Sequence, residues 1–306
     1  MTLTIGSLSA ANIAAQLAGN GLLLRTGPIV QRVRSRLPGV AQTIHTLYAH
    51  HPAHNDDGFA DFHVGVRRAS GLRGYWRAQA EFLFDGVQPF APLPLPQAYA
   101  LLEWGLNWCV AQTCHQYLII HAAAIERDGL AAILPAPPGS GKSTLCAALV
   151  QRGWRLCSDE LTLIDPADGT IQALARPINL KNQSIDLISD FAPETQFGPL
   201  THDTTKGTVG HLRPPQDSVE RVAERARPRW IVFPRWQAGS APQLIARPKA
   251  EAFIELADNA FNYSVLGEQG FTTLTGVIDA CESVSFTYDR LDDAIATFDR
   301  LAEQAR

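Results

Sequence analysis

The stretch APPGSGKST, residues 136–144, decides the fold prediction. A phosphate-binding loop of the Walker A type needs glycines where the backbone approaches the phosphates, a Lys for the β- and γ-phosphates, and a hydroxyl for Mg²⁺. Gly139 and Gly141 meet the first need, and Lys142 and Ser143 meet the others in register. The residues that we expect to contact the nucleotide are Pro138, Gly139, Ser140, Gly141, Lys142, Ser143 and Thr144.

The flanking sequence has the context that such a loop requires. Residues 130–136, LAAILPA, form an apolar run typical of a strand, and residues 144–153, TLCAALVQRG, favour a helix. An Asp-Gly pair at 128–129 follows a second apolar run, YLIIHAAAIE at 117–126, so the two runs predict a β-hairpin. Ala136 stands where the first Gly of the motif is usual, and a small residue suffices at a strand end. We therefore expect this loop to bind ATP.

Two acids follow the loop after one helix and one short strand. Asp159 and Glu160 come directly after WRLCS, residues 154–158, so the chain returns them to the phosphate end of the sheet. Phosphoryl transfer to an alcohol needs a base for the hydroxyl and a carboxylate for the metal. The pair suits both roles, although two solvated acids in a turn are an ordinary alternative.

Cations that could contact a phosphate or an acceptor lie farther along the chain. The segment 197–215, FGPLTHDTTKGTVGHLRPP, carries Lys206, His211 and Arg213 and is typical of a mobile lid or an acceptor-binding loop. Arg176 and Lys181 are similar candidates just before it. Such side chains neutralise charge on a transferring phosphoryl group, and the alternative is a solvated surface loop.

The organisation of the chain predicts two parts. Four prolines within residues 87–97 indicate an extended boundary, which divides a small N-terminal α/β module, 1–95, from a P-loop domain, 96–306. The expected helices are 9–19, 29–49 (interrupted at Pro38 and Gly39), 97–116, 249–262 and 291–305, and the expected strands outside the loop region are 59–69, 74–86 and 229–236.

Composition excludes several classes of partner. The 306 residues carry a formal net charge of −4, which gives no reason to expect bulk electrostatic binding to nucleic acid or to an anionic membrane. The spacing of the five cysteines fits neither a paired zinc site nor a secreted disulfide framework. No apolar run approaches the roughly 20 residues that span a bilayer, and no segment has the pattern of a signal peptide. We expect a cytoplasmic protein with five reduced thiols.

Several of these segments together resemble the HPr kinase/phosphorylase family of bacterial serine kinases. The similar features are the IHAAA strand with His121, the hairpin into the loop, and the acids of CSDE at 157–160. More narrowly, ARPINLKN at 175–182 and DTTKGTVGHLRPP at 203–215 resemble the HPr-kinase-related branch called HprK-related kinase A. The resemblance covers residues 115 to 235 and implies an α/β fold with a P-loop kinase domain of the HPr kinase and phosphoenolpyruvate-carboxykinase-like type.

The resemblance also implies roles for individual residues. Asp159 becomes the general base, Lys142 a phosphate ligand, and His121 a neighbour of the transferred phosphate, with a packed core histidine as the alternative for His121. Ser143 and Glu160 become ligands of Mg²⁺, with Asp159 as a further candidate. The related kinases assemble as oligomers, so a homo-oligomer is expected.

One departure from the family counts against its reverse, phosphorolytic activity. The family signature has a Glu two residues before an Arg-Gly pair, and the corresponding places here hold Leu174 and Pro177.

Three functions remain open from the sequence. The first is an ATP- and Mg²⁺-dependent kinase that phosphorylates a Ser of a small protein or peptide. The second is a kinase of a small-molecule alcohol, comparable to shikimate or gluconate kinases, although those chains usually begin at the P-loop and 135 residues precede it here. The third is a nucleotide-gated binding protein without transfer, against which the acidic pair argues.

Overall fold

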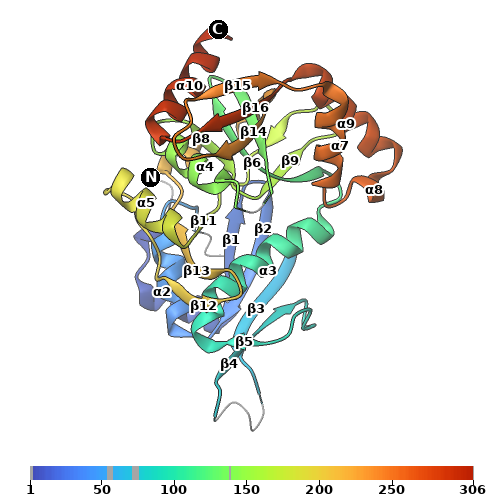
Figure 1. Ribbon diagram of the computed structural model, residues 1–306. Coiled ribbons are helices and arrows are strands. Elements are labelled where there is room, and N and C mark those ends of the chain that lie inside the picture. The colour runs from blue at the N-terminus through green and yellow to red at the C-terminus, as the bar shows by residue number, and fades with distance from the viewer. Residues whose placement is uncertain (1–2, 54–57, 71–75, 138, 306) are drawn as a thin grey trace.

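The protein is a mixed α/β structure with three sheets, seen here in a computed structural model that describes residues 3–53, 58–70, 76–137 and 139–305. The N-terminal part lies below the rest of the molecule in Figure 1, and the two parts meet along the middle. Among the described residues, no helix has both the length and the apolar character needed to cross a bilayer.

The N-terminal sheet has five strands in the order β1-β2-β3-β4-β5. Strands β2 and β3 pair in parallel, and the other neighbours are antiparallel. The elements of this part are η1 (Ile5–Ser7), α1 (Ala10–Ala18), β1 (Leu22–Thr26), β2 (Ile29–Ser35), α2 (Pro38–Leu47), β3 (Phe62–Arg68), β4 (Gln79–Phe84), β5 (Leu93–Pro94) and η3 (Leu95–Gln97).

The helix expected over residues 29–49 is wrong in its first half. Residues Ile29–Ser35 form strand β2, because Ile29, Val30 and Val33 are buried when the segment pairs with its neighbours on both sides. Pro38 does not interrupt a helix but begins α2, where its missing N–H is no loss. Ser9 caps α1 as expected, since its side chain accepts a hydrogen bond from the backbone N–H of Asn12 at 3.1 Å.

Helix α3 (Ala98–Thr113) packs on the N-terminal sheet, although the expected boundary after residue 95 places it in the second part. Gly105 lies against the ring of Phe82 from β4, so closely that a Cβ atom there would come within 2.2 Å of the ring. Trp108 makes edge contacts with Phe84 and Phe90, at 5.6 and 5.2 Å between ring centroids. By packing, α3 thus belongs to the N-terminal module, and its other face is free to meet the second part.

The central sheet of the second part has the order β10-β9-β6-β7-β14-β16-β15, with β8 also paired to β6. The hairpin expected around the Asp-Gly pair is confirmed: β6 and β7 pair antiparallel from Ala122–Pro135 to Arg127–Leu130, and both turn residues have positive φ. The strands are β6 (Leu118–Arg127), β7 (Leu130–Pro135), β8 (Arg155–Ser158), β9 (Leu161–Ile164), β10 (Ile171–Gln172), β14 (Arg227–Trp236), β15 (Gln243–Ala246) and β16 (Glu282–Tyr288).

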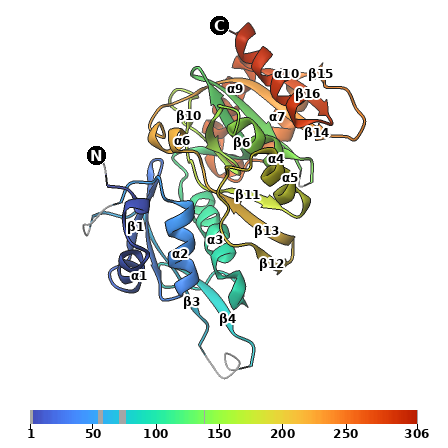
Figure 2. The same cartoon turned by 90° about the vertical axis from the view of Figure 1, so that its left-hand side faces the viewer.

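Helices cover both faces of this sheet (Figures 1 and 2). Alternate residues along β6 and β7 point to opposite layers, so Ala123 and Leu134 join one core and Ala124 and Ile133 the other. One layer holds α4 (Lys142–Val150) and α10 (Leu291–Gln304), with α5 (Gln183–Phe191) beside α4. The other layer holds α7 (Lys249–Asp258) and α9 (Glu268–Ala280), with α8 (Tyr263–Leu266) beside α9.

The segment 197–215, expected as an irregular lid or loop, is largely a β-hairpin. Strands β12 (Thr201–Thr204) and β13 (Gly207–Leu212) pair with each other, and β13 also pairs with β11 (Ile178–Lys181) in a small three-stranded sheet. Gly207 at the hairpin turn has φ of 83°. The segment ends in Pro214 and Pro215, which precede α6 (Gln216–Glu220).

Candidate functional site

The predicted phosphate loop connects the end of β7 to the start of α4. Gly139 and Gly141 have φ of 87° and 89°, a left-handed conformation that favours glycine, and α4 begins at Lys142. The backbone N–H of Trp236 donates to the carbonyl of Ser140 at 3.2 Å, which ties the loop to the end of β14. Ala136 is buried at the end of the strand, while Pro138 lies outside the described residues. The glycines therefore meet the backbone requirement of the motif.

Helix α4 places the remaining residues of the motif. Lys142 is 8% exposed, and its ammonium has no hydrogen-bond partner among the described residues. The hydroxyl of Ser140 is buried without a partner as well. Thr144 instead donates to the hydroxyl of Ser184 at 2.9 Å, which connects α4 to α5. Since a buried cation is costly unless an anion compensates it, the unpaired ammonium fits the phosphates of a nucleotide.

Asp159 lies in the turn between β8 and β9 and is 6% exposed. Its Oδ2 accepts a hydrogen bond from the backbone N–H of Asn179 at 3.0 Å, and its Oδ1 has no partner among the described residues. Burial raises the pKa of Asp159 from 3.8 to about 6, although the nearby positive charge of Lys142 and the hydrogen bond from the backbone N–H of Asn179 act in the opposite direction. A carboxylate with a pKa near neutrality and an unused oxygen is suited to general-base chemistry.

Glu160 points to helix α3. Asn107 of α3 donates to its Oε2 at 2.6 Å, and Asn179 of β11 approaches its Oε1 at 3.4 Å. No group of three or more His, Cys, Asp or Glu side chains among the described residues forms a metal site on its own. Mg²⁺ is commonly held by one or two carboxylates together with substrate phosphates, so this arrangement fits a metal that binds with the nucleotide.

His121 lies on β6, half-buried, and its ring packs against Phe261 at 5.7 Å between centroids. Its backbone N–H donates to the carbonyl of Asn259 at 2.8 Å. Burial, and after it the positive charge of Lys142, lowers the pKa of His121 to about 4. The imidazole is therefore neutral near pH 7, and it lies close enough to Lys142 and Glu160 for their charges to act on its pKa.

The three cations expected to contact a phosphate or an acceptor occupy different environments. Arg176 is buried, and its guanidinium pairs with Glu103 at 2.5 Å and donates to Asn107 at 2.6 Å. Lys206 is at the β12–β13 turn, with its ammonium 5.7 Å from the centre of the Trp104 ring. Arg213 follows β13, where burial lowers its pKa. Its charge acts on His50 of the N-terminal module. The guanidinium of Arg176 is thus engaged within the protein and positions its neighbours.

A cavity next to the acids brings residues expected from the sequence together with others that the sequence did not reveal. It is lined by the expected Asp159, Glu160, Arg176 and His211 and by Glu103, Trp104, Asn107, Ser158, Leu174, Pro177 and Asn179. Glu103, Trp104 and Asn107 come from α3, where the buried Glu103 accepts hydrogen bonds from Tyr48 at 2.8 Å and Tyr99 at 2.6 Å. The sequence signal was present, since Glu103 and Asn107 interrupt an otherwise apolar helix one turn apart.

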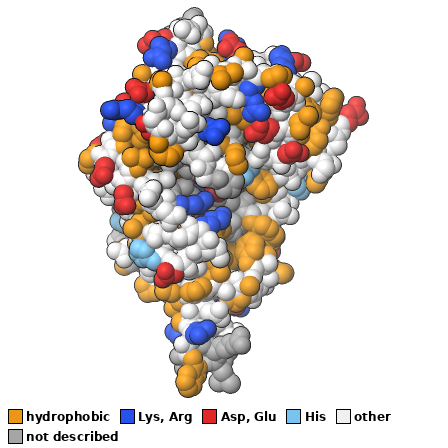
Figure 3. All heavy atoms as spheres, viewed as in Figure 1, with side chains coloured by type: hydrophobic (Ala, Val, Ile, Leu, Met, Phe, Trp, Pro, Cys, Tyr) orange, Lys and Arg blue, Asp and Glu red, His pale blue; other side chains and the backbone are white. Residues whose placement is uncertain are grey.

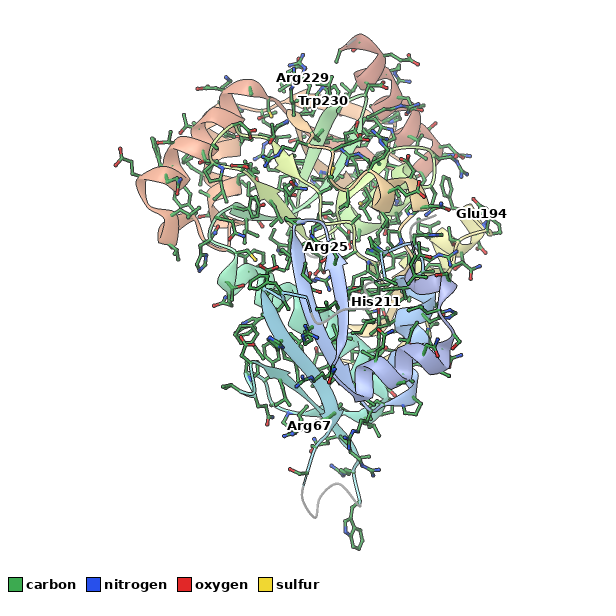
Figure 4. The ribbon with its side chains drawn as sticks, turned by 180° about the vertical axis from the view of Figure 1, so that it is seen from behind. Arg25, Arg67, Glu194, His211, Arg229 and Trp230 are labelled. Atoms are coloured by element: carbon green, nitrogen blue, oxygen red, sulfur yellow. The ribbon has the colours of Figure 1, made fainter. Side chains whose placement is uncertain are left out.

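Two views show the setting of the cavity. The face of Figure 3 is hollowed between the upper and lower parts of the molecule, with basic side chains at the lower edge of the hollow. Seen from behind in Figure 4, His211 lies in the middle of the molecule, beside the N-terminal module. The site therefore lies where the two parts meet.

Comparison with known proteins finds similarity to solved structures only. No family model and no curated protein matches the chain. The structure of the HPr(Ser) kinase/phosphatase from Coxiella burnetii is similar over 61% of this chain and 98% of the other, with 11% sequence identity and a TM-score of 0.27. A likeness at this level carries no information about activity.

Proposed function

We propose that the protein is a kinase that uses ATP and Mg²⁺ to phosphorylate a hydroxyl group. The observation that carries the proposal is that two buried groups of opposite charge occur in the same site and both lack hydrogen-bond partners. They are the ammonium of Lys142 and the Oδ1 atom of the Asp159 carboxylate. The ammonium follows a turn of the phosphate-loop type, and the carboxylate has its pKa raised to about 6. A cation for the γ-phosphate beside a base for a hydroxyl is what phosphoryl transfer to an alcohol requires.

The proposed reaction divides the work among these residues. The hydroxyl oxygen of the acceptor forms a bond to the γ-phosphorus of ATP while the bond from that phosphorus to the β-γ bridging oxygen breaks, and ADP leaves. The proton of the hydroxyl passes to Asp159, which later releases it to solvent. Lys142 stabilises negative charge on the phosphates, and because the side chain is already buried, little reorganisation is needed.

Ser143 and Glu160 are the residues that would hold Mg²⁺, with Asp159 as a further candidate. The metal would supply charge neutralisation on the phosphate oxygens. Asn107 and Asn179 hold Glu160 in one orientation through their amide groups. His121, uncharged near pH 7, leaves the negative charge of the phosphates to Lys142 and the metal.

The acceptor is a hydroxyl of one of two classes. The resemblance in the sequence favours a Ser of a small protein or peptide, and the alternative is a small-molecule alcohol.

The test of the proposed function uses Lys142→Ala and Asp159→Asn beside the wild type. ATP affinity and the release of ADP are measured with Mg²⁺ and candidate acceptors. We expect Lys142→Ala to abolish transfer and to weaken ATP binding strongly, and Asp159→Asn to keep ATP binding and lose transfer. Catalysis retained by Lys142→Ala would mean that the loop does not bind phosphates as proposed.

A further inference from the structure

The chain has four lysines, and three of them lie around His121, beside the phosphate loop. Lys142 begins α4, Lys181 ends β11, and Lys206 lies in the β12–β13 turn. Each of the three is close enough to the ring of His121 for its positive charge to lower the pKa of that ring. Two cations that do not belong to the loop therefore accompany Lys142 at the site.

Strand β11 directs Lys181 toward the two acids. Side chains two residues apart on a strand project from the same face, so Lys181 shares a face with Asn179. Asn179 contacts both acids, since its backbone N–H donates to Asp159 at 3.0 Å and its Nδ2 approaches Glu160 at 3.4 Å. The step of two residues separates the Cα atoms of Asn179 and Lys181 by roughly 7 Å. A ligand atom a few bonds away from a hydroxyl at Asp159 therefore lies within reach of the Lys181 ammonium.

Asn182 fixes the turn that carries Lys206 next to the end of β11. Its φ is 52°, and its side-chain amide donates to the carbonyl of Lys206 at 3.2 Å and accepts from the backbone N–H of Thr208 at 3.0 Å. Gly207 lies so close that a Cβ atom there would come within 2.2 Å of the Asn182 Oδ1 atom. The turn is thus bound to the residue that follows Lys181, and the two lysines are held near each other before any ligand binds.

The charges of Lys181 and Lys206 are available to a ligand. Among the described residues, neither ammonium has an acidic partner. Lys206 is exposed, with its ammonium 5.7 Å from the centre of the Trp104 ring, and Lys181 is half-buried. Like charges that are held close together repel each other, and a bound anion removes that cost. In Figure 3 basic side chains lie at the lower edge of the hollow between the two parts, where an anion can approach from solvent.

The phosphates of the nucleotide do not account for this pair of lysines. Lys142 lies in the loop and, with Mg²⁺, neutralises the phosphates in the proposed reaction. Lys181 and Lys206 instead come from the small sheet, which holds Asp159 through the backbone of Asn179. Asp159 is also close to Lys142, whose charge acts on its pKa. A hydroxyl at Asp159 would therefore have the cation of the loop and the lysine pair both nearby.

We propose that Lys181 and Lys206 bind an anionic group of the phosphate acceptor, a carboxylate or a phosphate monoester that lies a few bonds from the reacting hydroxyl. The proposal rests on the proposed kinase function and adds the charge class of the substrate. The hydroxyl gives its proton to Asp159 and forms a bond to the γ-phosphorus, while the bond from that phosphorus to ADP breaks. The anionic group stays bound to the two ammonium groups and orients the hydroxyl. A neutral alcohol lacks this second contact.

The experiment uses inorganic phosphate as a probe for the anionic group. Its binding is measured by titration calorimetry on protein saturated with Mg²⁺ and a non-hydrolysable ATP analogue, which occupies the loop and takes up Lys142. The wild type is compared with Lys181→Gln and Lys206→Gln. Lys249→Gln is the matched control, because Lys249 lies on α7 and pairs with Asp279 at 2.9 Å. Binding of the analogue itself is measured for every variant.

We expect the wild type to bind phosphate while the analogue is bound. Lys181→Gln and Lys206→Gln should each raise the Kd for phosphate about tenfold, because one hydrogen bond to a charged group is lost. Both variants should bind the analogue as the wild type does. Lys249→Gln should leave both Kd values close to those of the wild type.

Transfer from labelled ATP distinguishes the sources of the anionic group. Glycerol is compared with glycerate and glycerol 3-phosphate, and a peptide with Glu on both sides of its Ser is compared with its Gln counterpart. We expect the anionic member of the series that is phosphorylated to have the lower KM. This advantage should be lost in Lys206→Gln, whereas Lys249→Gln should keep it.

Three results overturn the acceptor proposal without touching the kinase function. The first is an analogue-loaded wild type that binds no phosphate, or phosphate binding that both lysine variants retain. The second is a neutral acceptor with a KM equal to that of its anionic counterpart. The third is a loss of analogue binding in the lysine variants as large as their loss of phosphate binding, which would assign both lysines to the nucleotide. Failure of the wild type to bind the analogue would instead refute the proposed function on which the acceptor proposal rests.

Discussion

Replacing Asp159 by Asn separates the proposed catalytic role of this carboxyl from its effect on the stability of the fold. Burial raises the pKa of Asp159 from 3.8 to about 6, so the folded protein holds the protonated form more tightly than the unfolded chain does. The group therefore favours folding fully below about pH 4, and this contribution is lost as the pH rises through about 6. At pH 7 the ionised Asp159 carboxylate is therefore less stable in its buried position than in the unfolded chain.

The magnitude follows from the shift in pKa. A change from 3.8 to about 6 corresponds to roughly 3 kcal/mol of free energy of unfolding, since each pKa unit is worth about 1.4 kcal/mol. Asn is nearly isosteric with the protonated carboxyl and does not titrate, and its Oδ1 can still accept from the backbone N–H of Asn179. Asp159→Asn should therefore be more stable than the wild type by up to about 3 kcal/mol at pH 7 to 8 and similar to it near pH 4.

The assay is unfolding by denaturant without nucleotide at several pH values from 4 to 8, for the wild type, Asp159→Asn and a control. Asp190→Asn is the matched control, because it makes the same change at an exposed position in α5. Phosphoryl transfer by Asp159→Asn is measured alongside and should be lost. A variant that is less stable than the wild type at pH 7, or whose stability difference is constant from pH 4 to 8, would refute the assignment of a strained carboxylate.

Three further predictions concern the same site and its support. The kcat/KM for the acceptor should rise with pH through about 6 and reach a plateau above pH 7, because Asp159 must be ionised to accept the proton; a pH-independent rate would exclude it as the base. Asn107→Leu should raise the Mg²⁺ concentration needed for half-maximal transfer by about 10- to 100-fold, because Glu160 loses the donor that orients it. An unchanged Mg²⁺ titration would contradict this role. Gly105→Ala should lower the free energy of unfolding by about 1–3 kcal/mol, since the added methyl overlaps the ring of Phe82. A thermal unfolding midpoint equal to that of the wild type would contradict this packing.

Local patterns predicted the phosphate loop and the elements beside it. Gly139 and Gly141 adopt the left-handed conformation, and the Asp-Gly turn forms the hairpin, because both features depend on the backbone preferences of a few adjacent residues. The strand after the helix and the acids after that strand followed from apolar runs of ordinary length. The same reasoning failed for residues 29–35, where pairing with β1 and β3 outweighs helical spacing in a short segment.

The sequence by itself thus determined the glycine-containing turn after β7, Lys142 at the start of α4 and the neighbouring acids, since these follow one another within about 25 residues. Only the tertiary structure decided what faces those acids. Helix α3 supplies Trp104 and Asn107 from the N-terminal module, and β13 supplies His211 from beyond the loop region. No local pattern encodes these contacts, because they depend on how two separately packed cores come together, and they form the walls of the cavity beside the acids.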